Sequence, residues 1–410
     1  EAVAIALIFA MTVPTPSLAF DNLSGKGHIG TYNNGGTIPS TVDRAVLIGG
    51  QGNQIDEKGD DTGITYPGQT SSFKIPTTGS ITGQEVPDTE GAVIISGLDN
   101  QAAGSNTAIL GGNQNVVYGW RSVAVGGYQN RVEGTGEGGG ANRANNVAIG
   151  GKNNYVGGQS DNAVAIGGAG NTVSAKNGIL IGGGYYDNTK SGSAANVYGY
   201  NVVEGGGSVI VTGLHNATSA DGSLVMGGSY NIARTPARFS VIMGGTSNET
   251  YVENVVVISG MCNDAKGDGS TIVGGSSNTT NSKQSLVIGG KNNETVAGSD
   301  LSLALGGENN KTKAGNSLTV GGKQNETNAQ LAMTVGGMQN NAAAYNSITV
   351  GGANNTTLGE QALALGGQNS RVEGTNAAVL GGQNNKTSGD RSVAAGGNDN
   401  WAKGDTSMTL

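Results

Sequence analysis

The sequence predicts an all-β fold, a flattened two-sided β-solenoid of about 21 coils. Three observations predict it: a glycine doublet recurs roughly every 15 residues, apolar residues alternate in the stretch before each doublet, and aromatic residues are scarce. The 410 residues include 75 glycines but only 4 Phe, 2 Trp and 12 Tyr, so the core must be thin and built from small aliphatic side chains. Collagen is excluded because glycine does not occupy every third position.

Charge and cysteine content exclude several function classes. The 22 basic and 30 acidic residues give a net charge of −8, which offers no electrostatic footprint for nucleic acid or for an anionic membrane. The chain has one cysteine, Cys262, and two histidines, His28 and His215. Catalytic triads, Cys/His metal sites and an intrachain disulfide framework have almost no residues to draw on, so we expect no enzyme activity, cofactor or metal.

Residues 1–19 have the composition of the C-terminal part of a secretory signal peptide. An apolar run from Ala2 to Val13 is followed by Ser17-Leu18-Ala19, which has the small-x-small form of a signal-peptidase site. The basic first region of such a peptide is missing, so we expect the chain to start inside a longer leader. A buried strand or helix is the alternative. Residues 20–44 would then form an N-terminal segment or cap.

The glycine doublets set the organisation of residues 45–410. Twenty of them, counting variants in which Ser or Thr replaces the first glycine, follow one another mostly 15 residues apart, and a degenerate unit surrounds Tyr198-Gly199. A period sustained over this length means a solenoid in which each unit is one coil. The doublets begin at 49, 96, 111, 126, 150, 167, 182, 212, 227, 244, 259, 274, 289, 306, 321, 336, 351, 366, 381 and 396.

Each unit is expected to hold two short strands. In the first strand, the residues one and three before the doublet are apolar almost everywhere, as in Val123 and Val125, and we expect this pair to face the core. In the second strand, the sixth residue after the start of the doublet is small and apolar or Thr, which predicts an inward position between polar outward ones. The sixth-position residues include Val117, Val132, Val173, Thr295, Thr312, Thr357, Val372 and Thr387.

A turn joins the two strands. Four residues after the doublet begins, an asparagine stands in eighteen of the twenty units. Gly and Asn are the residues that tolerate positive φ, so Gly-Gly-x-x-Asn predicts a sharp turn once per coil. In three representative units the predicted turn residues are Gly289, Gly290, Asn293, Gly321, Gly322, Asn325, Gly381, Gly382 and Asn385.

The first strand has a second apolar face. The residue two before the doublet lies opposite the expected core pair and is also apolar or Thr, although smaller. A continuous stripe of this kind predicts a partner surface, most simply another copy of the chain; a weakly apolar wet face is the alternative. The predicted partner-facing residues include Ala124, Ala165, Val225, Thr319, Thr334, Thr349 and Ala364.

The units themselves resemble a known family. Ser122-Val123-Ala124-Val125-Gly126 is similar to the head repeat of YadA-like trimeric autotransporter adhesins, and the unit from Gly381 to Gly389 is similar to the heads of the Moraxella ubiquitous surface proteins. The resemblance covers residues 45–410. It implies a left-handed parallel β-roll, three copies side by side as a homotrimer, and export to the outer-membrane surface of a Gram-negative-type bacterium. The implied partners are host extracellular matrix, a cell-surface receptor or other bacterial cells.

Other parts of the family pattern are missing from the sequence. It has no heptad stalk, no neck connector and no C-terminal membrane-anchor strands. Ser407 to Leu410 read as the first strand of a further unit, so we expect the chain to be a fragment of a longer protein. Contact with a membrane is expected only through the missing C-terminal anchor.

Two insertions and one cysteine remain open. The insertion at 54–91 is acidic and is either a binding loop or a solvated excursion, and a shorter one lies at 131–145. Asp56 to Asp61 do not have the spacing of a calcium-binding EF-hand loop. Cys262 lies in a turn, where a free or buried thiol is favoured over an interchain disulfide.

The function predicted from these features is a non-enzymatic surface adhesin head that binds through many weak contacts. An ice-binding or purely structural solenoid is one alternative; it would expose an array of threonines such as Thr295, Thr312 and Thr327. A polysaccharide-cleaving β-helix enzyme is another, and it would carry paired carboxylates on adjacent coils in a cleft.

Overall fold

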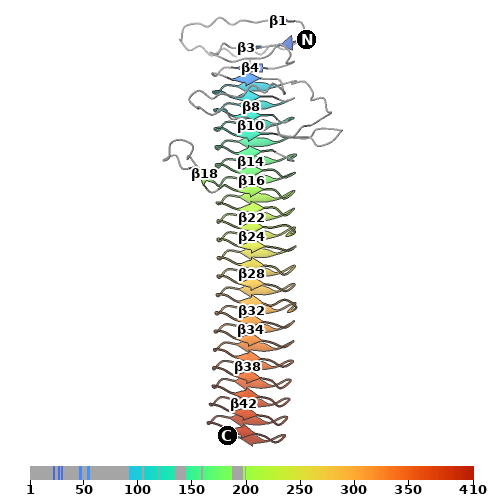
Figure 1. Cartoon of the computed structure of the whole chain (residues 1–410), viewed down its shortest axis with the longest axis vertical. Coiled ribbons are helices and arrows are strands. Elements are labelled where there is room, and N and C mark those ends of the chain that lie inside the picture. The colour runs from blue at the N-terminus through green and yellow to red at the C-terminus, as the bar shows by residue number, and fades with distance from the viewer. Residues whose placement is uncertain are drawn as a thin grey trace. The chain divides into compact units, whose positions relative to one another are not determined.

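The computed structural model is a two-sheet parallel β-solenoid of about 19 turns, which confirms the predicted all-β fold class (Figure 1). It describes residues 22–23, 26–27, 29–30, 46–48, 53–55, 92–103, 106–118, 120–133, 145–157, 160–186, 197–198 and 200–410. These residues contain no helix, and so none that has the length and apolarity needed to cross a bilayer. The chain divides into two compact units, residues 1–153 and residues 154–410.

The first unit contains parallel ladders in both sheets. Its first sheet joins β4, β6, β8, β10 and β12, and its second sheet joins β5, β7, β9 and β11. Its strands are β1 (Asn22–Leu23), β2 (Lys26–Gly27), β3 (Ile29–Gly30), β4 (Val46–Ile48), β5 (Gln54–Ile55), β6 (Val93–Ile95), β7 (Gln101–Ala102), β8 (Ala108–Leu110), β9 (Val116–Val117), β10 (Val123–Val125), β11 (Arg131–Val132) and β12 (Val147–Ile149).

The second unit repeats the same pair of strands in each coil. Three-residue strands form its first sheet: β14 (Val164–Ile166), β16 (Ile179–Ile181), β20 (Val209–Val211), β22 (Leu224–Met226), β24 (Val241–Met243), β26 (Val256–Ile258), β28 (Thr271–Val273), β30 (Leu286–Ile288), β32 (Leu303–Leu305), β34 (Leu318–Val320), β36 (Met333–Val335), β38 (Ile348–Val350), β40 (Leu363–Leu365), β42 (Ala378–Leu380), β44 (Val393–Ala395), and the two-residue β46 (Met408–Thr409).

Two-residue strands form the second sheet of this unit: β13 (Tyr155–Val156), β15 (Thr172–Val173), β19 (Val202–Val203), β21 (Ala217–Thr218), β23 (Ile232–Ala233), β25 (Glu249–Thr250), β27 (Asp264–Ala265), β29 (Thr279–Thr280), β31 (Glu294–Thr295), β33 (Lys311–Thr312), β35 (Glu326–Thr327), β37 (Asn341–Ala342), β39 (Thr356–Thr357), β41 (Arg371–Val372), β43 (Lys386–Thr387) and β45 (Trp401–Ala402). An antiparallel hairpin, β17 (Tyr185–Tyr186) with β18 (Val197–Tyr198), interrupts them.

The hairpin corrects one prediction about the repeat. The degenerate unit expected around Tyr198 is not a coil, because Tyr198 pairs with Tyr185 across the antiparallel hairpin. The coil that begins at Gly182 resumes after the hairpin, where Asn201 takes the turn position of the missing asparagine. Its backbone N–H donates to Asn171 Oδ1 at 3.1 Å.

The interior of each coil is very narrow. In the coil of the Gly321 doublet, four side chains point inward, namely Ser317, Thr319, Asn325 and Thr327, and they are 0 to 2% exposed. The sixth-position residues predicted to face inward, Val117, Val132, Val173, Thr295, Thr312, Thr357, Val372 and Thr387, are all fully buried, which confirms that part of the prediction.

The first strand, in contrast, faces the opposite way from the prediction. The residue two before the doublet points inward, and the larger residues one and three before it point outward, as the burial pattern of β34 shows. Alternation defines two faces but does not say which is inside, and the two sheets leave room mainly for Ala, Val, Thr or Ile. The predicted partner-facing residues Ala124, Ala165, Val225, Thr319, Thr334, Thr349 and Ala364 are therefore core residues, 0 to 1% exposed in the single chain.

The turn is where it was predicted, for a partly different reason. Both glycines of the doublet have positive φ, 59° at Gly321 and 73° at Gly322, and the pairs at Gly289-Gly290 and Gly381-Gly382 share this conformation. The next positive φ belongs to Gln324 (56°), the residue before the asparagine, and not to Asn325 itself. The expectation that the asparagine is present because it tolerates positive φ was wrong.

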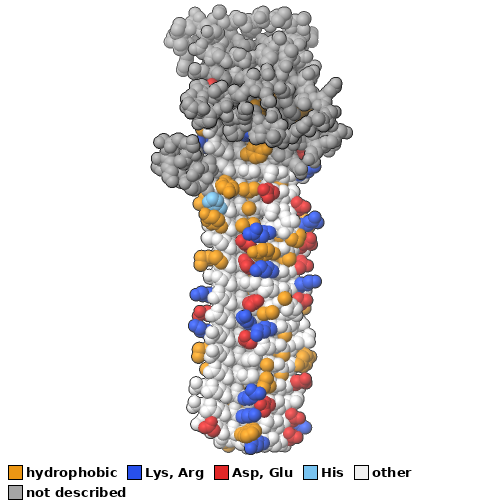
Figure 2. Space-filling model, in the orientation of Figure 1, with side chains coloured by type: hydrophobic (Ala, Val, Ile, Leu, Met, Phe, Trp, Pro, Cys, Tyr) orange, Lys and Arg blue, Asp and Glu red, His pale blue; other side chains and the backbone are white. Residues whose placement is uncertain are grey.

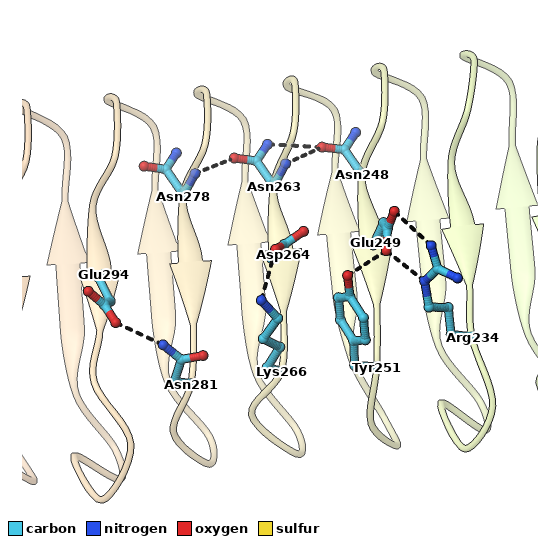
Figure 3. Close-up of polar contacts among 10 residues, drawn as sticks. All are labelled: Arg234, Asn248, Glu249, Tyr251, Asn263, Asp264, Lys266, Asn278, Asn281 and Glu294. Carbon is cyan, nitrogen blue, oxygen red and sulfur yellow. Dashed lines mark hydrogen bonds and ion pairs between the residues drawn. The ribbon is translucent and has the colours of Figure 1, made fainter.

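The turn asparagines instead form a buried hydrogen-bonded ladder. The N–H of Asn325 donates to Asn310 Oδ1 at 2.9 Å, and Asn325 Nδ2 donates to the carbonyls of Gly321 and Gly336, both at 3.0 Å. Asn293 and Asn385 likewise donate through Nδ2 to the first glycine of their own doublets. Figure 3 shows two steps of this ladder, from Asn248 through Asn263 to Asn278. One amide per coil satisfies polar groups that the tight corner would otherwise leave unpaired.

Several predicted segments lie outside the described residues. These are the leader at 1–19, most of the cap at 20–44, all of the 54–91 insertion except Gln54 and Ile55, and the part of the 131–145 insertion between 134 and 144.

Candidate functional site: the outward faces of the coil

The outward side of the first sheet is an aliphatic face. We define it as the outward residues, one and three before each doublet, of the first-sheet strands from β14 to β46 in the second unit. Nearly all of them are Val, Ile, Leu, Met or Ala, and none of these strands contains Lys, Arg, Asp or Glu. Sixteen strands about 4.8 Å apart make this face roughly 75 Å long.

This aliphatic face remains accessible to solvent in the single chain. Ile288 is 41% exposed and Leu365 is 46% exposed, although both belong to regular strands. Single exposed aliphatic residues are ordinary on protein surfaces, but an unbroken row of them on successive strands is typical of an interface.

The outward side of the second sheet has the opposite character. Its side chains carry both signs of charge, and pairs form between coils: Lys311 with Glu294 at 3.5 Å, Lys313 with Glu326 at 2.7 Å, and Lys386 with Glu373 at 3.0 Å. Figure 2 shows such charged side chains along the visible face of the second unit. Exposed ion pairs of this kind add little stability, but they keep the surface in water.

The densest group on this side joins two neighbouring coils around Glu249 (Figure 3). Arg234 Nε donates to Glu249 Oε2 at 2.7 Å, and the Tyr251 hydroxyl donates to the same oxygen at 2.5 Å. The hydrogen bond from Arg234 holds the pKa of Glu249 below its ordinary value. Burial, and then the bond to Glu249, raise the pKa of Tyr251 to about 12. In this group the charges of Arg234 and Glu249 are paired with each other, and the Tyr251 hydroxyl is hydrogen-bonded.

Paired carboxylates do occur on this sheet. Glu249 and Asp264 are neighbours in register on β25 and β27, and Lys266 Nζ donates to Asp264 Oδ2 at 2.9 Å (Figure 3). Acid–base hydrolysis of a glycosidic bond needs one carboxyl group that holds a proton near neutral pH. Glu249 is held in its charged form instead, because its pKa is lowered by Arg234.

No metal site is evident in the described part of the chain, where no three His, Cys, Asp or Glu side chains come together. The acidic residues Asp56 to Asp61 lie outside that part. Cys262 is an exposed free thiol.

The corner after each glycine doublet carries a feature that the repeat pattern did not predict. Tyr200, His215 and Tyr230 each stand immediately before a ladder asparagine, and their rings contact one another from coil to coil. The signal was present in the sequence, because this position holds Asn, Gln or Ser in most other coils.

No protein-family model matches the chain, and no curated protein matches it.

Proposed function

We propose that the chain is the head of a surface-exposed, non-enzymatic adhesin that assembles as a side-by-side homotrimer through the aliphatic face. The proposal keeps the resemblance to YadA-like trimeric autotransporter adhesins but moves the contact from the residues two before the doublet to those one and three before it.

The observation that carries the proposal is the difference between the two outward sides of the coil. The second sheet and the corners carry the charges, as in the corner pair Lys323–Glu308 at 3.3 Å, whereas the first sheet carries none over sixteen strands. A face roughly 75 Å long and one strand wide would leave an apolar area at or above the largest patches usual for a monomer.

Another copy of the chain is the occupant that this face fits best. The face is uncharged and periodic at the strand spacing, so an identical face presents the same period to it. The family resemblance adds the number of copies, which is three, and the left-handed sense of the coil. It also adds localisation at the outer membrane through a C-terminal anchor.

Adhesion would then follow from multivalency. Three copies place every outward second-strand residue and loop at three points around one assembly, and linked weak contacts gain avidity without any new interaction. The proposed partners are host extracellular matrix, a cell-surface receptor or other bacterial cells.

The alternatives lack the features that would carry them. An ice-binding solenoid needs exposed threonines, and Thr295, Thr312 and Thr327 are fully buried. A polysaccharide-cleaving enzyme needs a proton-holding carboxyl, and the paired carboxylates of β25 and β27 are matched with Arg234 and Lys266.

The test is attachment of the full chain to immobilised matrix proteins and to cells. We expect attachment by the natural chain, and a loss of at least tenfold when Leu305→Glu and Leu365→Glu place charges on the aliphatic face. Leu358→Glu is the matched control, because Leu358 is similarly exposed (38%) but lies outside the first strands. Absence of attachment by the natural chain, or equal attachment by the charged variant, would contradict the proposal.

A further inference from the structure

Three aromatic side chains occupy the same corner position in consecutive coils. Tyr200, His215 and Tyr230 precede the ladder residues Asn201, Asn216 and Asn231. The backbone N–H groups of Asn216 and Asn231 each donate to Oδ1 of the asparagine one coil before. We call the three rings the aromatic ladder. Tyr200 is 49% and Tyr230 is 53% exposed, so the rings lie on the surface. Figure 2 shows hydrophobic side chains beside a histidine along one edge of the second unit.

The rings are ordered by the spacing of the coils. The His215 and Tyr230 rings are stacked, with centroids 4.5 Å apart and planes 18° from parallel, and Tyr200 meets His215 edge to face at 5.5 Å. The strand spacing of about 4.8 Å therefore matches the distance at which flat rings stack.

Core packing does not explain the aromatic residues at this position. The backbone has a φ of 55° at His215 and 57° at Tyr230, a left-handed conformation that Asn tolerates well and that bulky side chains rarely adopt. Asn occupies the same position at 292, 309, 354, 369 and 384. An exposed Tyr here contributes little core packing and adds backbone strain, which points to a role in binding.

One face of the Tyr230 ring is covered by His215, and the other is turned toward coils with short side chains. The same corner position holds Ser247, Cys262 and Ser277 in the next three coils, all with φ near 55°. Backbone hydrogen bonds between neighbouring corners fix this order, as in Ser247 N–H to Ser229 O at 2.9 Å. These three coils, spaced about 4.8 Å apart, make a stretch of short side chains about 14 Å long. The stretch ends at Asn292, whose Nδ2 donates to Asn309 Oδ1 at 3.1 Å.

The chemistry around this stretch is neutral and hydroxyl-rich. The two corner rows from Leu214 to Ser277 hold no Lys, Arg, Asp or Glu, and the first charge along them is Lys291. Ser229 Oγ and Thr246 Oγ1, which lie 3.3 Å apart, belong to the residues directly before Tyr230 and Ser247. A pyranose has an apolar C–H face that stacks on an aromatic ring and a rim of hydroxyls that exchange hydrogen bonds with serine and threonine.

We propose that this corner is a carbohydrate-binding site, in which a neutral pyranose stacks on the free face of Tyr230 and an adjoining sugar lies over Ser247 and Cys262. The proposal names a ligand class for the adhesin and in that sense rests on the proposed function. The site takes neutral glycans because the two rows contain no charged partner for an acidic one.

An array of neutral glycans probed with the full chain tests the site, followed by titration of the strongest-binding glycan. Tyr230→Ala should weaken binding at least about tenfold, because the stacking surface is removed. Tyr345→Ala is the matched control, since Tyr345 is 46% exposed at the opposite corner and should bind as the natural chain does. Alkylation of Cys262, the only cysteine, with a bulky maleimide should also block binding.

The outcomes separate this inference from the adhesin proposal. Binding of no neutral glycan, or equal loss in the Tyr230 and Tyr345 variants, overturns the carbohydrate site even if the chain attaches to cells. Glycan binding that depends on Tyr230, in a chain that attaches to no matrix protein or cell, supports the site and contradicts the adhesin proposal. Circular dichroism of each variant shows whether the solenoid is intact.

Discussion

Two stretches of the second unit have the same strand arrangement and differ in the side chains that fill the interior of the coil. Between β20 and β30 the inward residues of the first strands are Ile210, Val225, Ile242, Val257, Ile272 and Val287. Between β34 and β38 they are Thr319, Thr334 and Thr349, which face the threonines of the second strands. The first strands have the same length and pair in the same parallel register in both stretches. The coil therefore does not require an apolar interior.

The threonine stretch works because its hydroxyls are paired with one another. Thr327 Oγ1 lies 2.8 Å from Thr319 Oγ1 and donates to Thr334 Oγ1 at 2.9 Å. Thr334 Oγ1 in turn donates to the carbonyl of Glu326 at 2.8 Å. A buried hydroxyl is tolerated when it has a partner and costs free energy when it has none.

Isolated threonines among aliphatic neighbours show the other side of the comparison. Thr250 and Thr295 lie opposite first strands whose inward residues are aliphatic, and the Oγ1 atoms of both are buried without a hydrogen-bond partner. Thr and Val have nearly the same shape, so either residue fills the interior of the coil. What differs is whether the hydroxyl meets a second hydroxyl across the coil.

The largest expected effect belongs to the corner that both stretches share. A Cβ at Gly322 would overlap Asn325 Nδ2 and the carbonyl of Gly337, and a Cβ at Gly245 would meet the equivalent atoms in the aliphatic stretch. We expect Gly322→Ala and Gly245→Ala each to lower the free energy of unfolding by more than about 3 kcal/mol in chemical denaturation. The control is Gly321→Ala, which meets open space and should cost only about 1 kcal/mol from its backbone conformation. Equal costs at Gly321 and Gly322 would contradict the geometry.

Replacing threonine by valine tests the comparison itself. Thr327→Val removes the link between Thr319 and Thr334 and should destabilise the protein by about 2 kcal/mol. Thr295→Val removes a hydroxyl that has no partner, so it should be neutral or stabilise by up to about 1 kcal/mol. Denaturant unfolding of the two variants gives both values, and the same sign for both would show that pairing does not decide the cost.

Ser370 offers a repair of the asparagine ladder. Ser370 occupies the asparagine position of its coil, and its N–H donates to Asn355 Oδ1 at 2.9 Å. Its own Oγ, however, is buried without a hydrogen-bond partner. Ser370→Asn should restore an amide at this corner and raise the free energy of unfolding by about 1 kcal/mol. A loss of stability would mean that the corner of this coil has no room for the amide.

The smallest expected effect is the pH dependence of the Glu249 network in the aliphatic stretch. Because the pKa of Glu249 is lowered from 4.5 in the folded chain, its contribution to stability is present above that value and is lost as the pH falls through the folded pKa. Glu249→Gln should therefore reduce stability at pH 7, and the difference from the natural chain should shrink as the pH is lowered through the folded pKa of Glu249. In Arg234→Ala the pKa of Glu249, followed by NMR, should rise toward its ordinary value; an unchanged pKa would show that Arg234 is not the cause.

The sequence predicted the period, the two strands per coil and the corner, because each depends on a repeated backbone requirement. It did not predict which face of the first strand is inside, since Val123, Ala124 and Val125 alternate equally well in either orientation. Size was the misleading cue: we expected the larger side chains inside, yet Ala124 is buried and its neighbours are not. The ladder role of Asn325 and the stacking of Tyr230 depend on contacts between coils, which a single repeat does not reveal.

We propose that other copies of the chain cover the aliphatic face, and the mass of the full chain in solution is the decisive measurement. Sedimentation velocity at micromolar concentration should give three times the chain mass of 40.7 kDa, and the variant with Leu305→Glu and Leu365→Glu should give the mass of one chain. A natural chain that sediments as a monomer, with the aliphatic face open to water, would contradict the claim.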